Sequence, residues 1–284
     1  MALSLANWNG RAALAGPDGG LVDLERRSDG RFGSDPMDAI RRWDELRDVA
    51  ADWLDDRGEP VSDGELGPCV PRPAKVFAIG LNYTDHIAEM GHEVPTAPVV
   101  FTKFPSCLTG PGAVVELSGD TVDWEVELVV VIGRAGRRIA PTDALSHVAG
   151  YTIGQDVSDR TVQRRGNPPQ FSMAKSFDGY GPLGGVLVDA RREDGSVDDG
   201  SGRSIWCEVN GTRMQDGDTS SMLFDVPTLV HELSQTCTLE PGDIIFTGTP
   251  PGVGAGRVPP VFLRAGDELV SGIDGLGTLT THFR

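Results

Sequence analysis

The stretch Trp124-Glu125-Val126-Glu127-Leu128-Val129-Val130-Val131-Ile132 places two acidic residues inside an otherwise apolar run. A β-branched run of this kind favours a strand, in which residues two apart point to the same face. The carboxylates of Glu125 and Glu127 should therefore project side by side. If they are buried, they repel each other and lose hydration unless a cation lies between them. We predict a divalent metal site, with a solvated strand face as the alternative.

Composition limits the classes of function open to this chain. Its 284 residues suffice for one large core and a smaller domain. A formal net charge of −17 argues against partners such as nucleic acid and anionic membranes. No stretch approaches the roughly 20 apolar residues that span a bilayer, and the first residues lack the basic region of a secretory signal. An acidic substrate would need local positive charge to approach.

The cysteines are few and widely spaced, with no Cys-x-x-Cys pair. They are Cys69, Cys107, Cys207 and Cys237. This spacing is typical of reduced thiols rather than of a disulfide framework or a zinc site, and it predicts a cytoplasmic protein.

Residues 1–70 are predicted to form a small N-terminal α/β domain. Strand-like segments near residues 3–5, 12–15 and 21–24 precede a helix that starts at the capping signal Ser34-Asp35-Pro36 and runs to about Leu54. A linker rich in proline and glycine, residues 58–73, follows.

Residues 71–284 are predicted to form a larger, mainly β domain. A helix is expected at Val226 to Leu233, and a hairpin turn at Asn210-Gly211. The expected strands cover residues 76–79, 99–102, 124–132, 148–153, 185–188, 205–209, 244–247 and 268–273. Because βαβ alternation is lacking, we predict an α+β, mainly β fold rather than a Rossmann fold.

The glycine-rich segment Gly252-Val253-Gly254-Ala255-Gly256 follows a strand, as a dinucleotide-binding loop would. However, Pro259-Pro260 follows it instead of a helix, and the spacing is not Gly-x-Gly-x-x-Gly. We expect its backbone amides to face an anionic ligand such as a carboxylate.

Two further acidic residues are candidates for a site. Asp156 ends the apolar segment 151–155, so it could reach the same point as the first pair, although it could instead cap a helix over 158–165. Glu89 stands three residues after His86 on a predicted helical turn. The glutamate could fix the imidazole tautomer and leave the other nitrogen as a base for water. An ordinary surface pair is the alternative.

Lys175 lies in the segment Ala174-Lys175-Ser176-Phe177-Asp178-Gly179-Tyr180-Gly181, which is rich in aromatic residues and glycine. It could be a solvated loop charge, or it could offset the excess negative charge of three carboxylates around a divalent ion.

Five segments in this order resemble motifs of the fumarylacetoacetate hydrolase family. They are Gly80-Leu81-Asn82-Tyr83-Thr84-Asp85-His86, Trp124-Glu125-Val126-Glu127-Leu128, Gly154-Gln155-Asp156-Val157-Ser158-Asp159-Arg160, Lys175-Ser176-Phe177-Asp178 and Gly248-Thr249-Pro250-Pro251-Gly252-Val253-Gly254. The resemblance covers residues 75–283 and extends only loosely to the first seventy. It implies a mixed β-roll catalytic domain, a small N-terminal α/β domain and a homodimer.

The resemblance also implies roles for individual residues. The metal, Mg²⁺ or Mn²⁺ with Ca²⁺ as a crystallographic substitute, would be held by Glu125, Glu127 and Asp156. His86 and Glu89 would form the water-activating dyad on a lid segment, and Lys175 would stabilise an enolate. The substrate-contacting positions would be Arg160, Gln163 and Thr249, with Lys103 as a weaker candidate. A further aspartate of the eukaryotic prototype is missing near Asn82, which suggests a site with three carboxylates.

These features predict a metal-dependent hydrolase that cleaves a carbon–carbon bond in an acylpyruvate-like or other β-diketo acid. The alternatives through the same enolate are isomerisation of a 2-oxo-diene acid of the 2-hydroxyhepta-2,4-diene-1,7-dioate type, decarboxylation of oxaloacetate, or a lyase reaction. Only hydrolysis strictly needs a water-activating base. A non-catalytic, metal-stabilised dimer that serves as a binding module is a third class. The expected partner is a small keto acid.

Overall fold

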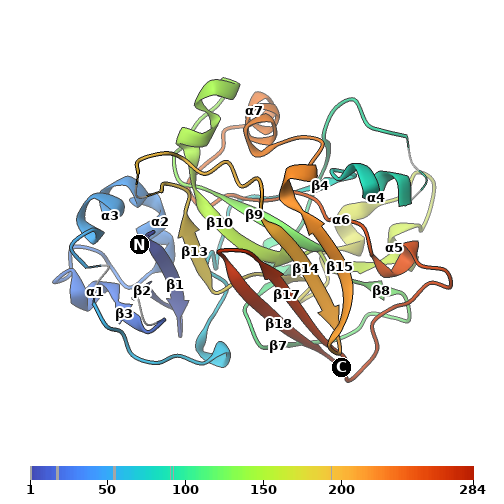
Figure 1. Cartoon of the computed structure of the whole chain (residues 1–284), viewed down its shortest axis with the longest axis horizontal. Coiled ribbons are helices and arrows are strands. Elements are labelled where there is room, and N and C mark those ends of the chain that lie inside the picture. The colour runs from blue at the N-terminus through green and yellow to red at the C-terminus, as the bar shows by residue number, and fades with distance from the viewer. Residues whose placement is uncertain (1, 17–18, 54–55, 90, 92, 193) are drawn as a thin grey trace.

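A computed structural model describes residues 2–16, 19–53, 56–89, 91, 93–192 and 194–284. Strands hold 33% of the residues and helices 22%, so the prediction of a mainly β, mixed fold is confirmed. Two sheets dominate the molecule (Figure 1). Among the described residues, no helix is long and apolar enough to cross a membrane.

The larger sheet has nine strands in the order β3-β2-β1-β13-β10-β9-β16-β4-β5. Its neighbours are antiparallel except for β16 and β4, which are parallel. The strand bounds are β1 Ser4–Trp8, β2 Arg11–Ala15, β3 Leu21–Asp23, β4 Val76–Gly80, β5 Val99–Thr102, β9 Val126–Ile132, β10 Val148–Gln155, β13 Val186–Asp189 and β16 Ile244–Phe246. The strands expected at these places are therefore present, with ends shifted by a few residues.

The second sheet has five strands in the order β15-β14-β17-β18-β7. Their bounds are β7 Ala113–Val115, β14 Ser204–Val209, β15 Thr212–Asp218, β17 Glu268–Ile273 and β18 Gly277–Phe283. Two short pairs join β8 Val122–Asp123 with β11 Ser158–Asp159 and β6 Leu108–Thr109 with β12 Gly181–Pro182. Strands β15 and β18 were not predicted, because their polar and threonine-rich residues lack a continuous apolar pattern. Strand β7 was not predicted either, because its three apolar residues are too few to show a pattern.

Seven α-helices and five short 3₁₀ helices lie in the described part of the chain. The α-helices are α1 Leu24–Arg27, α2 Pro36–Arg41, α3 Trp43–Ala50, α4 Thr84–Glu89, α5 Arg160–Gln163, α6 Phe171–Ala174 and α7 Val226–Thr236. The 3₁₀ helices are η1 Asp63–Glu65, η2 Pro105–Cys107, η3 Pro141–His147, η4 Thr219–Ser221 and η5 Gly254–Gly256.

The single helix predicted over residues 34–54 is wrong in its extent. Asp35 does cap the start, accepting a hydrogen bond from the Met37 amide at 3.0 Å. The helix then breaks at Arg42, whose backbone leaves the helical region at φ −114° and ψ 32°. The second segment, α3, ends at Ala50, and Leu54 lies outside the described residues. The break lets both segments bury apolar side chains, Ile40 from the first and Trp43 from the second, in one core.

Strand β9 is buried on both faces and separates two cores. Its side chains Val126, Leu128, Val130 and Ile132 join the core beneath the second sheet. Val129 and Val131 point the other way, into a core shared with the N-terminal helices. Because side chains alternate along a strand, Glu127 projects to the same face as Val129 and Val131.

The N-terminal segment extends the larger sheet rather than forming one of its own. Strand β1 pairs with β13, so residues 4–23 supply one edge of the nine-stranded sheet (Figure 1). The predicted boundary at residue 70 therefore divides the sequence but not this sheet. All four cysteines are free thiols.

Candidate metal centre and active site

Three carboxylates meet where β9 begins and β10 ends. The two strands are antiparallel, with Gly154 opposite Glu127 and Gln155 opposite Val126, so Asp156 emerges beside the acidic pair. One oxygen from each of Glu125, Glu127 and Asp156 lies within 4.8 Å of the others. All three residues are buried, so a solvated strand face is excluded. An oxygen-only donor set of this kind fits a hard divalent cation.

Asp156 does not cap the following helix. The residue that caps α5 is Asp159, whose side chain accepts hydrogen bonds from the amides of Thr161 at 2.9 Å and Val162 at 3.1 Å. The Asp156 carboxylate is thereby free to face the acidic pair.

Two lysines bind the carboxylates from the side of the loops that follow β5 and α6. Lys175 Nζ donates to Glu125 Oε2 at 2.8 Å and to Asp156 Oδ2 at 2.6 Å, so it is not a solvated loop residue. Lys103 Nζ donates to Asp156 Oδ1 at 2.8 Å, to the Tyr180 carbonyl at 3.0 Å and to the Lys175 carbonyl. Its ammonium is fully enclosed by protein oxygens and does not line the pocket. The weaker expectation that Lys103 contacts substrate is therefore not supported, and its position suits it to orient Asp156.

A third cation approaches from α5. The Arg160 Nη2 atom lies 2.7 Å from Glu125 Oε1 and 2.7 Å from Asp123 Oδ2. Arg160 Nε also donates to Asp123 at 2.8 Å. Asp123 was not predicted as a site residue, although it stands only two residues before Glu125. Its completely buried carboxylate is the fourth acid of the cluster.

The surrounding charges shift the pKa values of the carboxylates in opposite directions. Burial alone would raise the pKa of Glu125, but the charges of Lys175 and Arg160 lower it to about 2. Burial raises the pKa of Glu127 well above its ordinary value, and the neighbouring charges of Asp156 and Glu125 add to this effect. Four carboxylates facing three cations leave one unbalanced negative charge, which falls on Glu127. Binding of a divalent cation would leave this cluster with one net positive charge.

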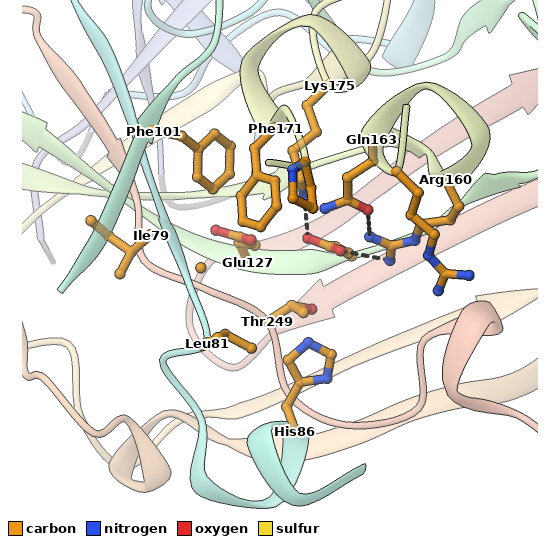
Figure 2. Close-up of a pocket in the computed structure, with 14 residues that line it drawn as sticks. Ile79, Leu81, His86, Phe101, Glu127, Arg160, Gln163, Phe171, Lys175 and Thr249 are labelled. Carbon is orange, nitrogen blue, oxygen red and sulfur yellow. Dashed lines mark hydrogen bonds and ion pairs between the residues drawn. The ribbon is translucent and has the colours of Figure 1, made fainter. Parts of the chain in front are cut away.

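The predicted dyad faces the same pocket. His86 Nδ1 lies 3.1 Å from Glu89 Oε2, and Figure 2 shows the imidazole pointing from α4 toward Thr249 and the carboxylates. His86 is buried and lines the pocket, so an ordinary surface pair is excluded. The Gly252 amide donates to both oxygens of Glu89, at 3.0 and 3.2 Å. Glu89 is thus held from two sides.

The amides of the glycine-rich loop bind carboxylates of the protein itself, whereas the expectation from the sequence was an anionic ligand. Besides the bond from Gly252 to Glu89, the amides of Gly254 and Ala255 donate to Asp123 at 2.7 and 3.0 Å. Only glycine fits at position 254, because a Cβ atom there would lie 1.9 Å from the Val261 carbonyl oxygen. This single loop holds both the glutamate of the dyad and the aspartate behind Arg160.

A pocket of about 390 Å³ contains these groups. Arg160, Gln163 and Thr249, the substrate-contacting positions that the resemblance implies, all line it. Figure 2 shows Arg160 and Gln163 on the side opposite Ile79 and Phe101. The full lining is Ile79, Gly80, Leu81, His86, Phe101, Glu125, Glu127, Arg160, Gln163, Arg164, Pro169, Phe171, Lys175 and Thr249. The Phe101 and Phe171 rings pack edge to face, with 5.5 Å between their centroids, and form an apolar wall of the pocket.

Asn82 serves the fold rather than the site. It is fully buried, and its amide group donates to the carbonyls of Phe224 at 3.0 Å and Thr247 at 2.7 Å, while its oxygen accepts from the Phe224 amide at 2.8 Å. These side-chain hydrogen bonds are therefore all to backbone atoms. This arrangement agrees with a site built from three carboxylates.

The family described as "Fumarylacetoacetate (FAA) hydrolase C-terminal" matches residues 75–284. The human mitochondrial oxaloacetate tautomerase FAHD2A is 47% identical over 212 residues, which are 74% of this chain and 66% of that protein. This chain thus matches just under two thirds of the length of that relative.

Two solved structures share the fold. A fumarylacetoacetate hydrolase from Exiguobacterium antarcticum superposes with a TM-score of 0.85 at 34% identity, covering 100% of this chain and 99% of that chain. A fumarylpyruvate hydrolase from Pseudomonas aeruginosa, solved in complex with Mn²⁺ and pyruvate, gives a TM-score of 0.65 at 30% identity over 74% of this chain and 89% of that chain.

Proposed function

The chain belongs to the fumarylacetoacetate hydrolase family, and we propose that it is a metal-dependent hydrolase that cleaves a carbon–carbon bond in an acylpyruvate-like β-diketo acid. The observation that carries this proposal is the His86–Glu89 pair, which faces the same pocket as the three buried carboxylates. A base directed at a metal-binding pocket is what hydrolysis needs in order to activate water.

Glu125, Glu127 and Asp156 would hold the metal. A bound Mg²⁺ or Mn²⁺ would act as a Lewis acid that polarises the carbonyl oxygens of a 2-oxo acid. The Mn²⁺ found with the P. aeruginosa relative supports a divalent ion of this kind. The Gly248 amide donates to Glu127 Oε2 at 2.7 Å and fixes the orientation of that carboxylate.

His86 is the proposed base. In the proposed tautomer Nδ1–H donates a hydrogen bond to Glu89, which leaves Nε2 as a proton acceptor for a water molecule in the pocket. The water oxygen would then attack the carbonyl carbon that lies remote from the 2-oxo acid group. Because the Gly252 amide restrains Glu89, the imidazole needs no reorientation before it accepts the proton.

Lys175 is the proposed stabiliser of the enolate that cleavage leaves. An ammonium group has three N–H donors, and Glu125 and Asp156 use two of them. The third remains for a substrate oxygen, since the side chain lines the pocket. A charge-assisted donor at a developing oxyanion is a strong source of transition-state stabilisation.

A second candidate is keto–enol tautomerisation of an oxaloacetate-like 2-oxo diacid. It is favoured by the 47% identity to a protein of that activity. Tautomerisation also passes through an enolate, so it would use the carboxylates and Lys175, with His86 moving a proton on carbon instead of activating water.

The test is a substrate screen with the purified protein. Acylpyruvates, oxaloacetate and 2-oxo-diene acids are incubated with Mg²⁺, and the products are identified by chromatography. Hydrolysis should depend on Mg²⁺ and fall by about 10²- to 10⁴-fold in His86→Ala, the usual contribution of a general base. Tautomerisation of oxaloacetate without hydrolysis of any acylpyruvate would establish the second candidate. The absence of any turnover would favour a non-catalytic binding module.

Two expectations accompany this proposal. We propose a homodimer that acts on a small keto acid, without nucleic-acid or membrane partners, in the cytoplasm. Light scattering of the purified protein and fractionation of its source cells would test the oligomeric state and the location.

A further inference from the structure

One cation of the pocket lacks an acidic partner. Lys175 and Arg160 also line the pocket, but their charges already face Asp123, Glu125 and Asp156. Arg164 makes no side-chain ion pair or hydrogen bond with any described residue of the protein. In a chain with 42 acidic residues and only 25 lysines and arginines, an arginine without an acidic partner is available to bind an anionic ligand.

Arg164 is held beside the groups already assigned to substrate binding. It follows directly on α5 as its C-terminal cap, with its amide close to the carbonyls of Arg160 and Val162. Residues four apart on a helical turn lie on the same side, so Arg160 and Arg164 both reach the pocket. The apolar side chains of Ile79, Phe101 and Phe171 also line the pocket, and Figure 2 shows Ile79 and Phe101 on the side opposite Arg160.

We propose that Arg164 binds a second carboxylate on the substrate and so selects 2-oxo diacids over 2-oxo monoacids. This inference rests on the proposed function, which places the 2-oxo acid end of the substrate at the three carboxylates and their metal. The carbon chain then spans the pocket, and the terminal carboxylate pairs with the guanidinium.

The chemistry of the guanidinium favours this role. Its planar fork offers two parallel N–H donors, which match the two oxygens of a carboxylate. Arg164 is exposed at the pocket rim, so the pair keeps part of its hydration. A hydrogen bond to a charged group in such a setting changes affinity by about tenfold or somewhat more.

The experiment compares ligands that differ only at the far end. The probes are 2-oxoglutarate with 2-oxopentanoate, and 2-oxoadipate with 2-oxohexanoate, each pair having one chain length and either a carboxylate or a methyl terminus. Their Kd values are measured by calorimetry on the full chain with saturating Mg²⁺. The variants are Arg164→Met and, as the matched control, Arg165→Met. Arg165 is an exposed neighbour with the same charge that does not line the pocket.

The wild-type protein should bind the diacid about tenfold more tightly than the monoacid in at least one pair. Arg164→Met should reduce this ratio to near one while leaving the monoacid Kd within about twofold. Arg165→Met should keep the wild-type ratio, because it changes the net charge equally but not the pocket.

Three results would overturn the assignment while the proposed function stands. In the first, the wild type binds monoacids in the presence of Mg²⁺ but does not bind diacids more tightly. In the second, Arg164→Met keeps the wild-type preference for diacids. In the third, Arg165→Met loses that preference to the same extent as Arg164→Met. If none of the four acids binds in the presence of Mg²⁺, the proposed metal and 2-oxo acid site itself fails, and the role of Arg164 fails with it.

Discussion

The charge of Lys175 is determined by the buried carboxylates around it. Burial lowers the pKa of its ammonium, but the adjacent carboxylates of Asp156 and Glu125 more than offset this, and the pKa is raised overall. The side chain therefore stays charged at neutral pH, and it also lies 5.1 Å from the centre of the Phe101 ring. A permanent cation at this position is suited to an enolate rather than to proton transfer.

Lys175→Met should lower kcat by about 10²- to 10³-fold in the Mg²⁺-saturated protein, because one donor to a developing oxyanion is lost while the stem volume is kept. Lys175→Arg should rescue poorly, since a planar fork does not replace a compact ammonium in a closed site. Steady-state kinetics and unfolding curves are compared with Lys75→Met, a control that removes a lysine paired with Glu240 and Asp243. A kcat near the wild-type value in Lys175→Met would remove this lysine from the mechanism.

The stability of the metal-free protein should depend measurably on pH because of Glu127. Its pKa is raised above the ordinary value of 4.5, so above pH 4.5 and up to the raised pKa the folded protein keeps a proton that the unfolded chain has lost. The metal-free protein should therefore lose stability as pH rises through this range. Mg²⁺ binding should release that proton, because a ligand carboxylate must be ionised.

Calorimetry of Mg²⁺ binding at one pH, in two buffers with different ionisation enthalpies, measures the number of protons released. We expect up to about one proton per ion within the stated window and none in Glu127→Gln, together with a large loss of Mg²⁺ affinity in that variant. A binding enthalpy that does not depend on the buffer in the wild type would contradict the charge balance derived for the site.

The sequence revealed the acids of this site more readily than the cations that hold them. Glu125 and Glu127 are visible because strand alternation is a local rule. The partner of Asp123 is Arg160, 37 residues away, and Lys103 lies 53 residues from Asp156. Spacing carries no information about such pairs, so Asp123 was missed and Lys103 was expected to contact the substrate rather than Asp156.

At the scale of elements, one glycine loop links helix α4 to the buried carboxylates of the pocket. The amide of Gly252 holds Glu89, and those of Gly254 and Ala255 hold Asp123. The composition of the loop indicated its anion-binding amides but not which anions they face. The helix over residues 34–54 shows the same limit, since its apolar spacing was read correctly while the break at Arg42 depends on packing.

Gly254→Ala should test this link. The new Cβ atom would collide with the Val261 carbonyl, so the loop must shift and the buried Asp123 must lose amide donors. We expect a loss of about 1–3 kcal/mol in the free energy of unfolding, the cost of an unsatisfied buried acceptor. Hydrolysis should fall as well, because both Glu89 and Arg160 lose support.

Gly64→Ala is the matched control, since a Cβ atom there meets no atom within 4 Å. Urea unfolding and kcat/KM are measured for both variants. If Gly254→Ala matches Gly64→Ala in stability and rate, the loop does not position these acids.

At the scale of the whole molecule, the nine-stranded sheet joins segments that the sequence analysis separated. Strand pairing between β1 and β13 brings together residues about 180 positions apart, as in the register of Ser4 with Val188. Composition and linker signals locate such a segment along the chain but not its partner strand. The resemblance in residues 75–283 located the part of the chain that matches the family, because its motifs are local.

The net charge of −17 gives the whole molecule a field that opposes its proposed anionic substrate. The metal-loaded cluster would be positive, but its influence is short-ranged, so the distant negative charges should dominate the approach. Raising NaCl from about 10 mM to about 150 mM shortens the Debye length from about 30 Å to about 8 Å and screens this repulsion. With Mg²⁺ kept saturating, kcat/KM should rise over that range while kcat stays constant, and the rise should be steeper for a dianionic than for a monoanionic substrate. A fall in kcat/KM with salt would show instead that the positive charges of the pocket, Arg164 among them, control the encounter.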